Sequence, residues 1–444
     1  AIPRTMPRTQ PNVVIITCHD LGQHLHCYGV EGVRSPRIDA LAAEGVRFAN
    51  SFCTAPQCSP SRASLFTGRY PHSNGVMGLT HADFAWDLHD QERHLATLLR
   101  DAGYQTTAIG VTHETRHADR HGFDQRLGGR GDREMAQAAA KVIHDAAKTD
   151  KPFYLQVGFF QPHRARPGFG TAPDTANGIS VPPYLVDDLG AREEFAYFQG
   201  CVNSLDANVG VILDALTESG QADDTLFIFT TDHGIPFPRA KCSVYDPGLE
   251  VALIVRHPRG GVTGGRVYEP MISNVDYVPT LLDWLGVARP GDAPPLQGRS
   301  FAALLRGEAY VDREEIFGEM TFHDYCDPRR CVRTTTHKLI VNFSTAPFFM
   351  NPSQSWRPKT VTVDPPEPAY AYHQPVELYD LRRDPLETCN LAEDPDHAQV
   401  CADLLGRVHG WMTDTADPLL EGIPNSPMHT AAVRSLREGR SSAP

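Results

Sequence analysis

The chain has 444 residues, of which 41% are hydrophobic and 21% are charged, a composition typical of globular proteins that bury a large core. Acidic residues outnumber basic ones by 54 to 41, and the resulting net charge of -13 argues against nucleic acid as a partner. It does not exclude a small anionic substrate, because a local basic pocket can lie within an acidic protein.

No apolar stretch is long enough to cross a bilayer, so we expect no membrane association. Residues 1–10 are polar, contain two prolines and predict a flexible tail without a signal-peptide core. Ten cysteines without a C-x-x-C pair or regular spacing do not resemble a disulfide framework. We therefore expect a cytoplasmic protein, although a signal cleaved before Ala1 would leave the same chain.

Strand patterns alternate with helical patterns through the first two thirds of the chain. The expected strands are Asn12–Thr17, Thr106–Ile109, Phe153–Phe159, Leu226–Thr230 and Val251–Val255. The expected helices are Pro36–Glu44, His94–Ala102 and a long one whose apolar residues run from Cys201 to Leu216. The alternation predicts an α/β fold, with a large, mostly parallel sheet sandwiched by helices.

The pattern changes to irregular loops and short strands after about residue 312. This change predicts a catalytic α/β domain over residues 11–312. It also predicts a smaller C-terminal α+β domain over residues 313–444, with a small antiparallel sheet. The last stretch, Ser435–Pro444, is expected to be a loose tail.

Polar clusters follow four of the expected strands: His19-Asp20, His113, His163 and Asp232-His233. Binding and catalytic groups of open α/β sheets gather at the carboxyl ends of the strands. Four such clusters at equivalent positions predict one site at this edge of the sheet.

A cysteine motif precedes a short helical run. Cys58 and Arg62, in the sequence Cys-Ser-Pro-Ser-Arg, lie just before Ala63–Thr67. A helix beginning here places Cys58 where backbone N–H groups favour anions, with Arg62 one turn later. A lone cysteine is more often a buried, inert residue than a reactive one. The residues around Cys58 must therefore distinguish between these two interpretations.

The C-x-P-x-R motif at Cys58, with the residues that follow it, resembles the signature of the sulfatase family. Further matches are Pro11–Val14 leading to Asp20, Thr231–Gly234, Glu377–Asp380, Asp384-Pro385 and Asn390-Leu391. Within the family the sulfamidase branch is the most similar, on Gly234–Pro238 and Pro162–Arg164. The resemblance implies an alkaline phosphatase-like fold and oxidation of Cys58 to formylglycine by a formylglycine-generating enzyme.

The resemblance also implies a metal site. Asp20, Asp232 and His233 are the implied ligands of one divalent ion, for which Ca²⁺, Mn²⁺ and Mg²⁺ are the candidates. Most sulfatases have a second aspartate where this chain has His19, which either binds the ion or only lines the site. A further imidazole ligand would shift the preference from Ca²⁺ towards Mn²⁺.

Three further side chains match catalytic positions of the family. His113 is the implied base beside the formylglycine, while His163 and Lys241 are implied to contact sulfate near the leaving group. Where the family commonly has a lysine, this chain has Val111. Arg116, His117 and Arg164 are equal candidates to replace that charge.

The expected function is hydrolysis of sulfate esters, aryl sulfates or N-sulfo groups through a formylglycine hydrate and a divalent metal. The alternatives are a phosphonate monoester or phosphodiester hydrolase of the same superfamily and, more remotely, a non-catalytic sulfate-binding relative. The expected partner is a small anionic sulfated substrate, and a homo-oligomer stays open. His323 and Asp324 either reach the site or, as we favour here, lie in a solvated loop.

Overall fold

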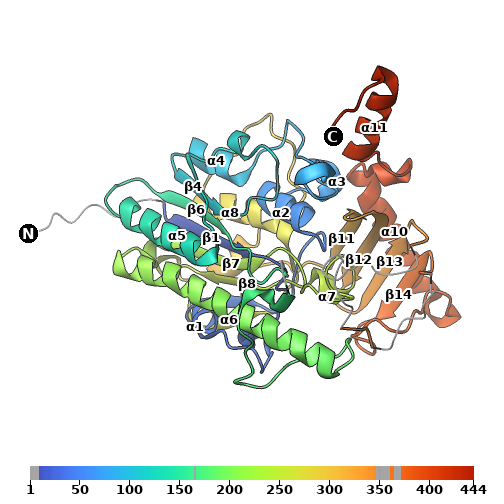
Figure 1. Cartoon of the computed structure of the whole chain (residues 1–444), viewed down its shortest axis with the longest axis horizontal. Coiled ribbons are helices and arrows are strands. Elements are labelled where there is room, and N and C mark those ends of the chain that lie inside the picture. The colour runs from blue at the N-terminus through green and yellow to red at the C-terminus, as the bar shows by residue number, and fades with distance from the viewer. Residues whose placement is uncertain (1–9, 165–166, 347–349, 351–360, 365–371) are drawn as a thin grey trace, which may run out of the picture.

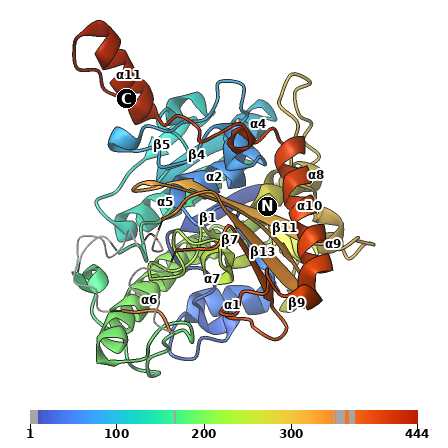
Figure 2. The same cartoon turned by 90° about the vertical axis from the view of Figure 1, so that its right-hand side faces the viewer.

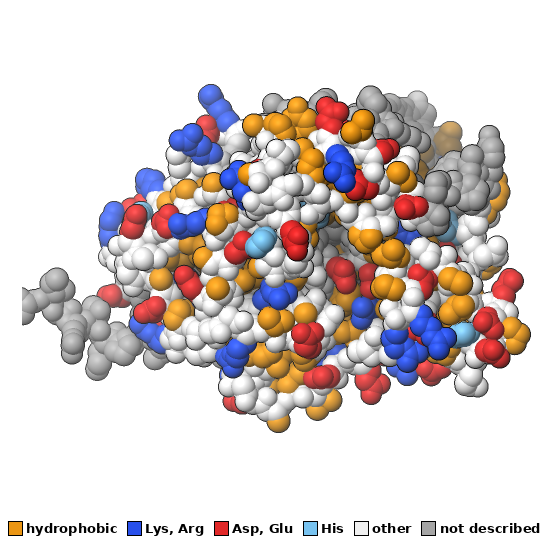
Figure 3. Space-filling view, turned by 90° about the horizontal axis from the view of Figure 1, so that it is seen from below, with side chains coloured by type: hydrophobic (Ala, Val, Ile, Leu, Met, Phe, Trp, Pro, Cys, Tyr) orange, Lys and Arg blue, Asp and Glu red, His pale blue; other side chains and the backbone are white. Residues whose placement is uncertain are grey.

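The computed structural model describes residues 10–164, 167–346, 350, 361–364 and 372–444 (Figures 1 and 2). The flexible tail expected at residues 1–10 lies, except for Gln10, outside the described residues. No helix in the described parts of the chain has both the length and the apolar character that a membrane span requires. Figure 3 shows one face of the molecule, on which acidic and basic side chains are interspersed.

An eight-stranded sheet forms the centre of the molecule, in the order β5-β4-β6-β1-β7-β8-β2-β9. Its strands are β1 (Asn12–Cys18), β2 (Val46–Phe48), β4 (Gln105–Gly110), β5 (Gln125–Leu127), β6 (Phe153–Gly158), β7 (Thr225–Thr231), β8 (Leu253–Arg256) and β9 (Arg266–Tyr268). All neighbouring pairs are parallel except those that involve β8. The expected mostly parallel sheet is confirmed.

Helices cover both faces of this sheet (Figure 1). On β1, Val14 and Ile16 pack into the core against one helix layer, whereas Val13 and Ile15 pack into the core on the opposite face. The first layer contains α1 (Pro36–Glu44), α5 (Asp132–Ala146) and α6 (Leu189–Glu218). The second contains α2 (Cys58–Thr67), α4 (Leu95–Asp101), α8 (Tyr277–Leu285) and α9 (Ala302–Arg306). Burial on both faces explains the continuous apolar runs of the central strands.

Four parallel strands, β4, β6, β1 and β7, are consecutive neighbours in the sheet. Their carboxyl ends therefore share one edge, and the loops that follow them contain the four polar clusters of the sequence. The convergence of these clusters at one edge is confirmed.

A second, four-stranded antiparallel sheet has the order β11-β12-β13-β14. Its strands are β11 (Glu315–Phe322), β12 (Cys326–Thr334), β13 (His337–Asn342) and β14 (Val376–Asp380), and α10 (Ala398–Asp414) packs on it. The small antiparallel C-terminal sheet is confirmed, and we keep the division between residues 312 and 313 as a proposal. The loose tail expected from Ser435 is wrong in part, because α11 (Pro427–Glu438) continues to Glu438.

A buried ion cluster joins this second sheet to the segments around it. Arg330, fully buried, pairs with Asp417 at 2.5 Å and with Glu319 at 3.3 Å. The ring of His72, next to α2 in the chain, contacts Glu319 at 2.8 Å and the Thr415 hydroxyl at 2.8 Å. His72, Glu319 and Asp417 include metal-ligand types, but Arg330 pairs with both carboxylates, and we assign the cluster a structural role.

Replacing Arg330 with methionine should destabilise the fold by about 3–5 kcal/mol, because two buried carboxylates would lose their cation. Denaturant or thermal unfolding measures this change. The matched control is Arg383→Met, since the Arg383 side chain is 83% exposed and lies 3.9 Å from its partner Asp380. Equal stabilities of the two variants would contradict the structural role of the cluster.

Candidate active site

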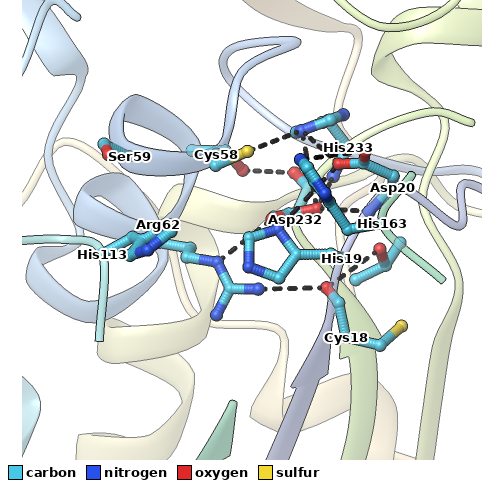
Figure 4. A network of polar contacts seen from close by, with 12 residues as sticks. Cys18, His19, Asp20, Cys58, Ser59, Arg62, His113, His163, Asp232 and His233 are labelled. Carbon is cyan, nitrogen blue, oxygen red and sulfur yellow. Dashed lines mark hydrogen bonds and ion pairs between the residues drawn. The ribbon is translucent and has the colours of Figure 1, made fainter. Parts of the chain in front are cut away.

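Cys58 is the first residue of α2, a helix whose residues are all buried and which ends at Gly68 in the left-handed conformation. Its Sγ lies 3.3 Å from His233 Nε2 (Figure 4). Burial raises the pKa of the Cys58 thiol to about 12, although the Lys241 ammonium opposes the shift. The unmodified side chain is therefore a protonated thiol, which is a poor nucleophile.

Asp232 is the centre of the polar network. Its fully buried carboxylate accepts hydrogen bonds from the backbone N–H groups of Asp20, at 2.9 Å, and His233, at 3.0 Å. Arg62 Nε donates to the same carboxylate at 3.0 Å, and Arg62 Nη2 donates to the Cys18 carbonyl at 3.2 Å. Arg62 thus orients a carboxylate and two strand ends, in addition to lying one turn from Cys58.

Asp20 follows β1 with a φ of 50°, a left-handed conformation that is uncommon for residues other than glycine. Lys241 Nζ donates to both of its carboxylate oxygens, at 2.9 and 3.1 Å. Burial alone would raise the pKa of Asp20, but Lys241, with His163 and His233, holds it well below its ordinary value. Asp20 is therefore an ionised, buried carboxylate.

The environment of His19 suits a metal ion. Its Nδ1 lies 3.1 Å from Asp232 Oδ2, yet neither ring nitrogen has a hydrogen-bond partner among the described residues. Ligand atoms of His19, Asp20, Cys58 and Asp232 all lie within 4.8 Å of one another. Burial lowers the pKa of His19, which keeps the ring neutral and able to bind a cation. His233 Nε2 lies 3.2 Å from Asp20 Oδ1, so it faces the same position.

His113 is linked through Thr80 to Ser59, the residue after Cys58. The Thr80 hydroxyl donates to the His113 carbonyl at 2.7 Å, and the Thr80 N–H donates to the Ser59 hydroxyl at 3.1 Å. Among the described residues, the buried Nδ1 of His113 has no hydrogen-bond partner. The His113 ring lies 5.3 Å from the ring centroids of both His19 and His81. Burial and the neighbouring His19 hold the pKa of His113 well below its ordinary value.

His163 lies on the Asp20 side of the network. Its Nε2 is 3.9 Å from Asp20 Oδ2, and its ring centroid is 5.4 Å from that of His19. Burial, followed by Lys241, lowers its pKa to about 3. All nine residues singled out in the sequence therefore lie in one network: His19, Asp20, Cys58, Arg62, His113, His163, Asp232, His233 and Lys241.

Two aromatic side chains were missed in the sequence. His81 stacks on His113, and nothing in its local sequence distinguishes it from a loop residue. Phe160 stacks on His19, with ring centroids 6.1 Å apart and planes at 11°, while 48% of it is exposed. Phe160 directly follows the expected strand Phe153–Phe159. It could therefore have been predicted from the rule that functional residues follow the carboxyl ends of parallel strands.

The interpretation of His323 and Asp324 as a solvated loop is wrong for His323, which is 7% exposed. The two residues lie in the tight turn between β11 and β12. The Gln57 side chain, next to Cys58, donates to the Phe322 carbonyl at 2.9 Å. This hydrogen bond links the turn of the C-terminal sheet to the residue next to Cys58.

None of the three candidates for the missing lysine charge is shown to supply it. Val111 is buried. Arg116 and His117 are exposed, and His117 lies 3.6 Å from Asp87. Arg164 forms an ion pair with Glu194. Within the network, Lys241 and Arg62 are the cations.

Comparisons with known proteins agree with this geometry. The sulfatase family model matches residues 11–287, and the model for the C-terminal part of N-sulphoglucosamine sulphohydrolase matches residues 239–367. Human N-sulphoglucosamine sulphohydrolase is 31% identical, over 94% of this chain and 92% of that protein. Human arylsulfatase A is 27% identical, over 86% of this chain and 83% of that protein.

Solved structures show the same fold. A 2-O GAG sulfatase superposes with a TM-score of 0.71 at 23% identity, covering 93% of this chain and 94% of its own. The phosphonate monoester hydrolase of Agrobacterium radiobacter gives a TM-score of 0.68 at 21% identity, covering 93% and 97%. The family matches span most of the chain and include the cysteine motif and all four strand-end clusters. The chain therefore belongs to the sulfatase family of sulfuric ester hydrolases, within the alkaline phosphatase superfamily.

Proposed function

We propose that the chain is a sulfatase of the sulfamidase type, which removes a sulfo group from the nitrogen or oxygen of a small sugar-like substrate. The match of residues 239–367 to the C-terminal part of N-sulphoglucosamine sulphohydrolase carries this proposal. That segment contains Lys241, which donates to Asp20, and the turn with His323 and Asp324. It therefore supplies one cation of the site and the turn that is linked to Gln57.

Two groups complete the site in this proposal. Asp20, Asp232, His233 and His19 would hold a divalent ion, which would supply Lewis acidity. Cys58 would be the residue oxidised to formylglycine, whose hydrate would supply the nucleophilic hydroxyl. Arg62 would fix the orientation of Asp232 as a ligand, because its Nε donates to the Asp232 carboxylate.

The remaining side chains contact the charged sulfuryl group or transfer protons. Lys241 and His163 both lie within 4 Å of Asp20, where they can contact the sulfuryl oxygens and the departing atom. The unpartnered Nδ1 of His113 can accept a proton as sulfate is released. In this proposal, Lys241 and His163 assist departure of the leaving group, and His113 assists regeneration of the nucleophile.

The donor set favours Mn²⁺ over Ca²⁺ in this proposal. Ca²⁺ prefers six to eight oxygen ligands, whereas two imidazoles and two carboxylates suit a first-row transition ion better. Replacing His19 with aspartate, the usual family residue, should shift the preference back towards Ca²⁺. Elemental analysis and the ion-dependent rise in melting temperature measure the preference independently of activity.

A substrate profile tests the function. Purified protein should hydrolyse N-sulfoglucosamine and 4-nitrophenyl sulfate with higher kcat/KM than a phenylphosphonate monoester. A higher value for the phosphonate ester would favour the alternative function in the same superfamily. Lack of turnover of every sulfated compound, with Cys58 converted and metal bound, would contradict the proposal.

Truncating His163 or Lys241 to alanine should slow poor leaving groups more than good ones. Negative charge builds on the bridging atom as its bond to sulfur breaks. The Lys241 cation stabilises that charge, and the neutral His163 ring can donate a hydrogen bond to it. We expect losses on the order of 100-fold for alkyl sulfates and sulfamates, and much smaller losses for 4-nitrophenyl sulfate. Turnover across aryl sulfates of rising leaving-group pKa measures this. An equal loss along the whole series would mean that these residues only position the substrate.

A further inference from the structure

The turn between β11 and β12 is hydrogen-bonded to Gln57, which precedes Cys58, and to Met77. The Gln57 side chain donates to the Phe322 carbonyl at 2.9 Å, and the Phe322 N–H donates to the Met77 carbonyl at 3.1 Å. The turn itself closes through the His323 N–H, which donates to the Tyr325 carbonyl at 3.2 Å. These contacts hold the backbone of the turn in place beside the residue that precedes Cys58.

Asp324 is the charged, partly accessible side chain of this turn. Its carboxylate is 33% exposed and lies 3.2 Å from Nδ1 of the buried His323. The hydrogen bond with His323 lowers the pKa of Asp324, and Lys241 lowers it further. Lys241 and His233 also act on the pKa of His323, so the turn lies within electrostatic reach of the site. The turn therefore places a carboxylate, held by His323 and linked through Phe322 to Gln57, within electrostatic reach of Lys241.

The chemistry of this carboxylate differs from that of the groups around it. Lys241, together with a divalent ion in the proposed site, would attract the sulfo group, whereas the Asp324 carboxylate accepts hydrogen bonds and repels anions. The half-exposed Phe160 ring, stacked on His19, offers an apolar face to a ring-shaped substrate. A sugar presents both an apolar face and hydroxyl donors.

We propose that Asp324 restricts the enzyme to substrates with a single anionic group. It accepts hydrogen bonds from neutral hydroxyls beside the sulfo group that is removed, and it disfavours a second sulfate or carboxylate there. This inference rests on the proposed function, because it names the substrate class of that same site. Asp324 is a specificity residue here and takes no part in bond breaking.

The test compares two substrates that differ by one anionic group, N-sulfoglucosamine and its 6-O-sulfated derivative. The wild-type enzyme should prefer the singly sulfated sugar. Asp324→Asn should reduce that preference in kcat/KM by about 10-fold, since the repulsion is lost and one hydrogen-bond acceptor is weakened. Asp324→Glu, which keeps the charge, should retain most of the preference.

The matched control is Asp312→Asn, which removes the same charge from an exposed residue beyond the opposite end of β11. It should leave the preference unchanged. An unchanged preference in Asp324→Asn, with both sugars still hydrolysed, would overturn this inference and leave the proposed function standing. Failure of the wild-type enzyme to hydrolyse any sulfated compound would instead overturn the proposed function, and this inference with it.

Discussion

Replacing Cys58 with alanine should reduce turnover of sulfate esters by roughly 10⁵-fold or more, the scale of losing a catalytic nucleophile. Alanine cannot be oxidised to an aldehyde, so the hydrate that attacks sulfur in the proposed mechanism cannot form. The fold should survive, because alanine suits a helix and the exchange removes a single buried sulfur atom. Initial rates with 4-nitrophenyl sulfate, together with the melting temperature, measure both effects.

Cys53 provides the matched control for this variant. It is also a fully buried thiol in the segment that precedes α2, and its Sγ lies 3.7 Å from the Gly248 carbonyl. Cys53→Ala should change stability by a similar amount and preserve most of the turnover. Near-wild-type turnover by Cys58→Ala would exclude the formylglycine mechanism. Mass spectrometry of the wild-type Cys58 peptide gives the fraction in which the thiol has become an aldehyde.

Asp232→Asn should abolish metal binding and reduce turnover by about 10³-fold, since it removes a buried negative charge from the proposed ion site. The amide also cannot accept all the contacts of the carboxylate, which faces Arg62, His19 and two backbone N–H groups. Elemental analysis of the purified variant tests metal content, and the thermal shift on adding Mn²⁺ or Ca²⁺ tests affinity.

The exposed Asp214, paired with Arg37 at the surface, supplies the control for this charge change. Asp214→Asn should keep the metal content, the thermal shift and the activity of the wild type. If Asp232→Asn bound the divalent ion as tightly as the wild type, the ligand set proposed here would be wrong.

The strand-end clusters could be predicted because parallel strands place their carboxyl ends at one edge. His19, His113, His163 and Asp232 were assigned to one site from this rule alone, and their network agrees with it. The central strands β1, β6 and β7 could be recognised from their apolar runs, which arise when both faces of a sheet are buried. The three-residue strands β2, β5 and β9 were not predicted, because they are too short to show a pattern. The roles of the four residues in catalysis came from the family resemblance and stay predictions.

The turn at His323 and Asp324 could not be placed from the sequence. Its decisive contact joins Gln57 to Phe322, residues 265 positions apart, through a side chain and a backbone carbonyl. No periodicity or local motif encodes such a pairing. The helix α11, by contrast, has local signals that were overlooked: Ser426 caps it, Pro427 begins it and Gly439 ends it.

The complete burial of α2 bears on when the enzyme can mature. Cys58 is 5% exposed, and both neighbours, Gln57 and Ser59, are buried with it. If Cys58 is converted to formylglycine as proposed, the oxidising enzyme would have to enclose the cysteine and the residues beside it, and so would act on the chain before this helix packs. The active fraction of a preparation would then be set during synthesis. Unfolding and refolding the purified protein would preserve that fraction, and producing more of the oxidising enzyme in the same cell would raise it.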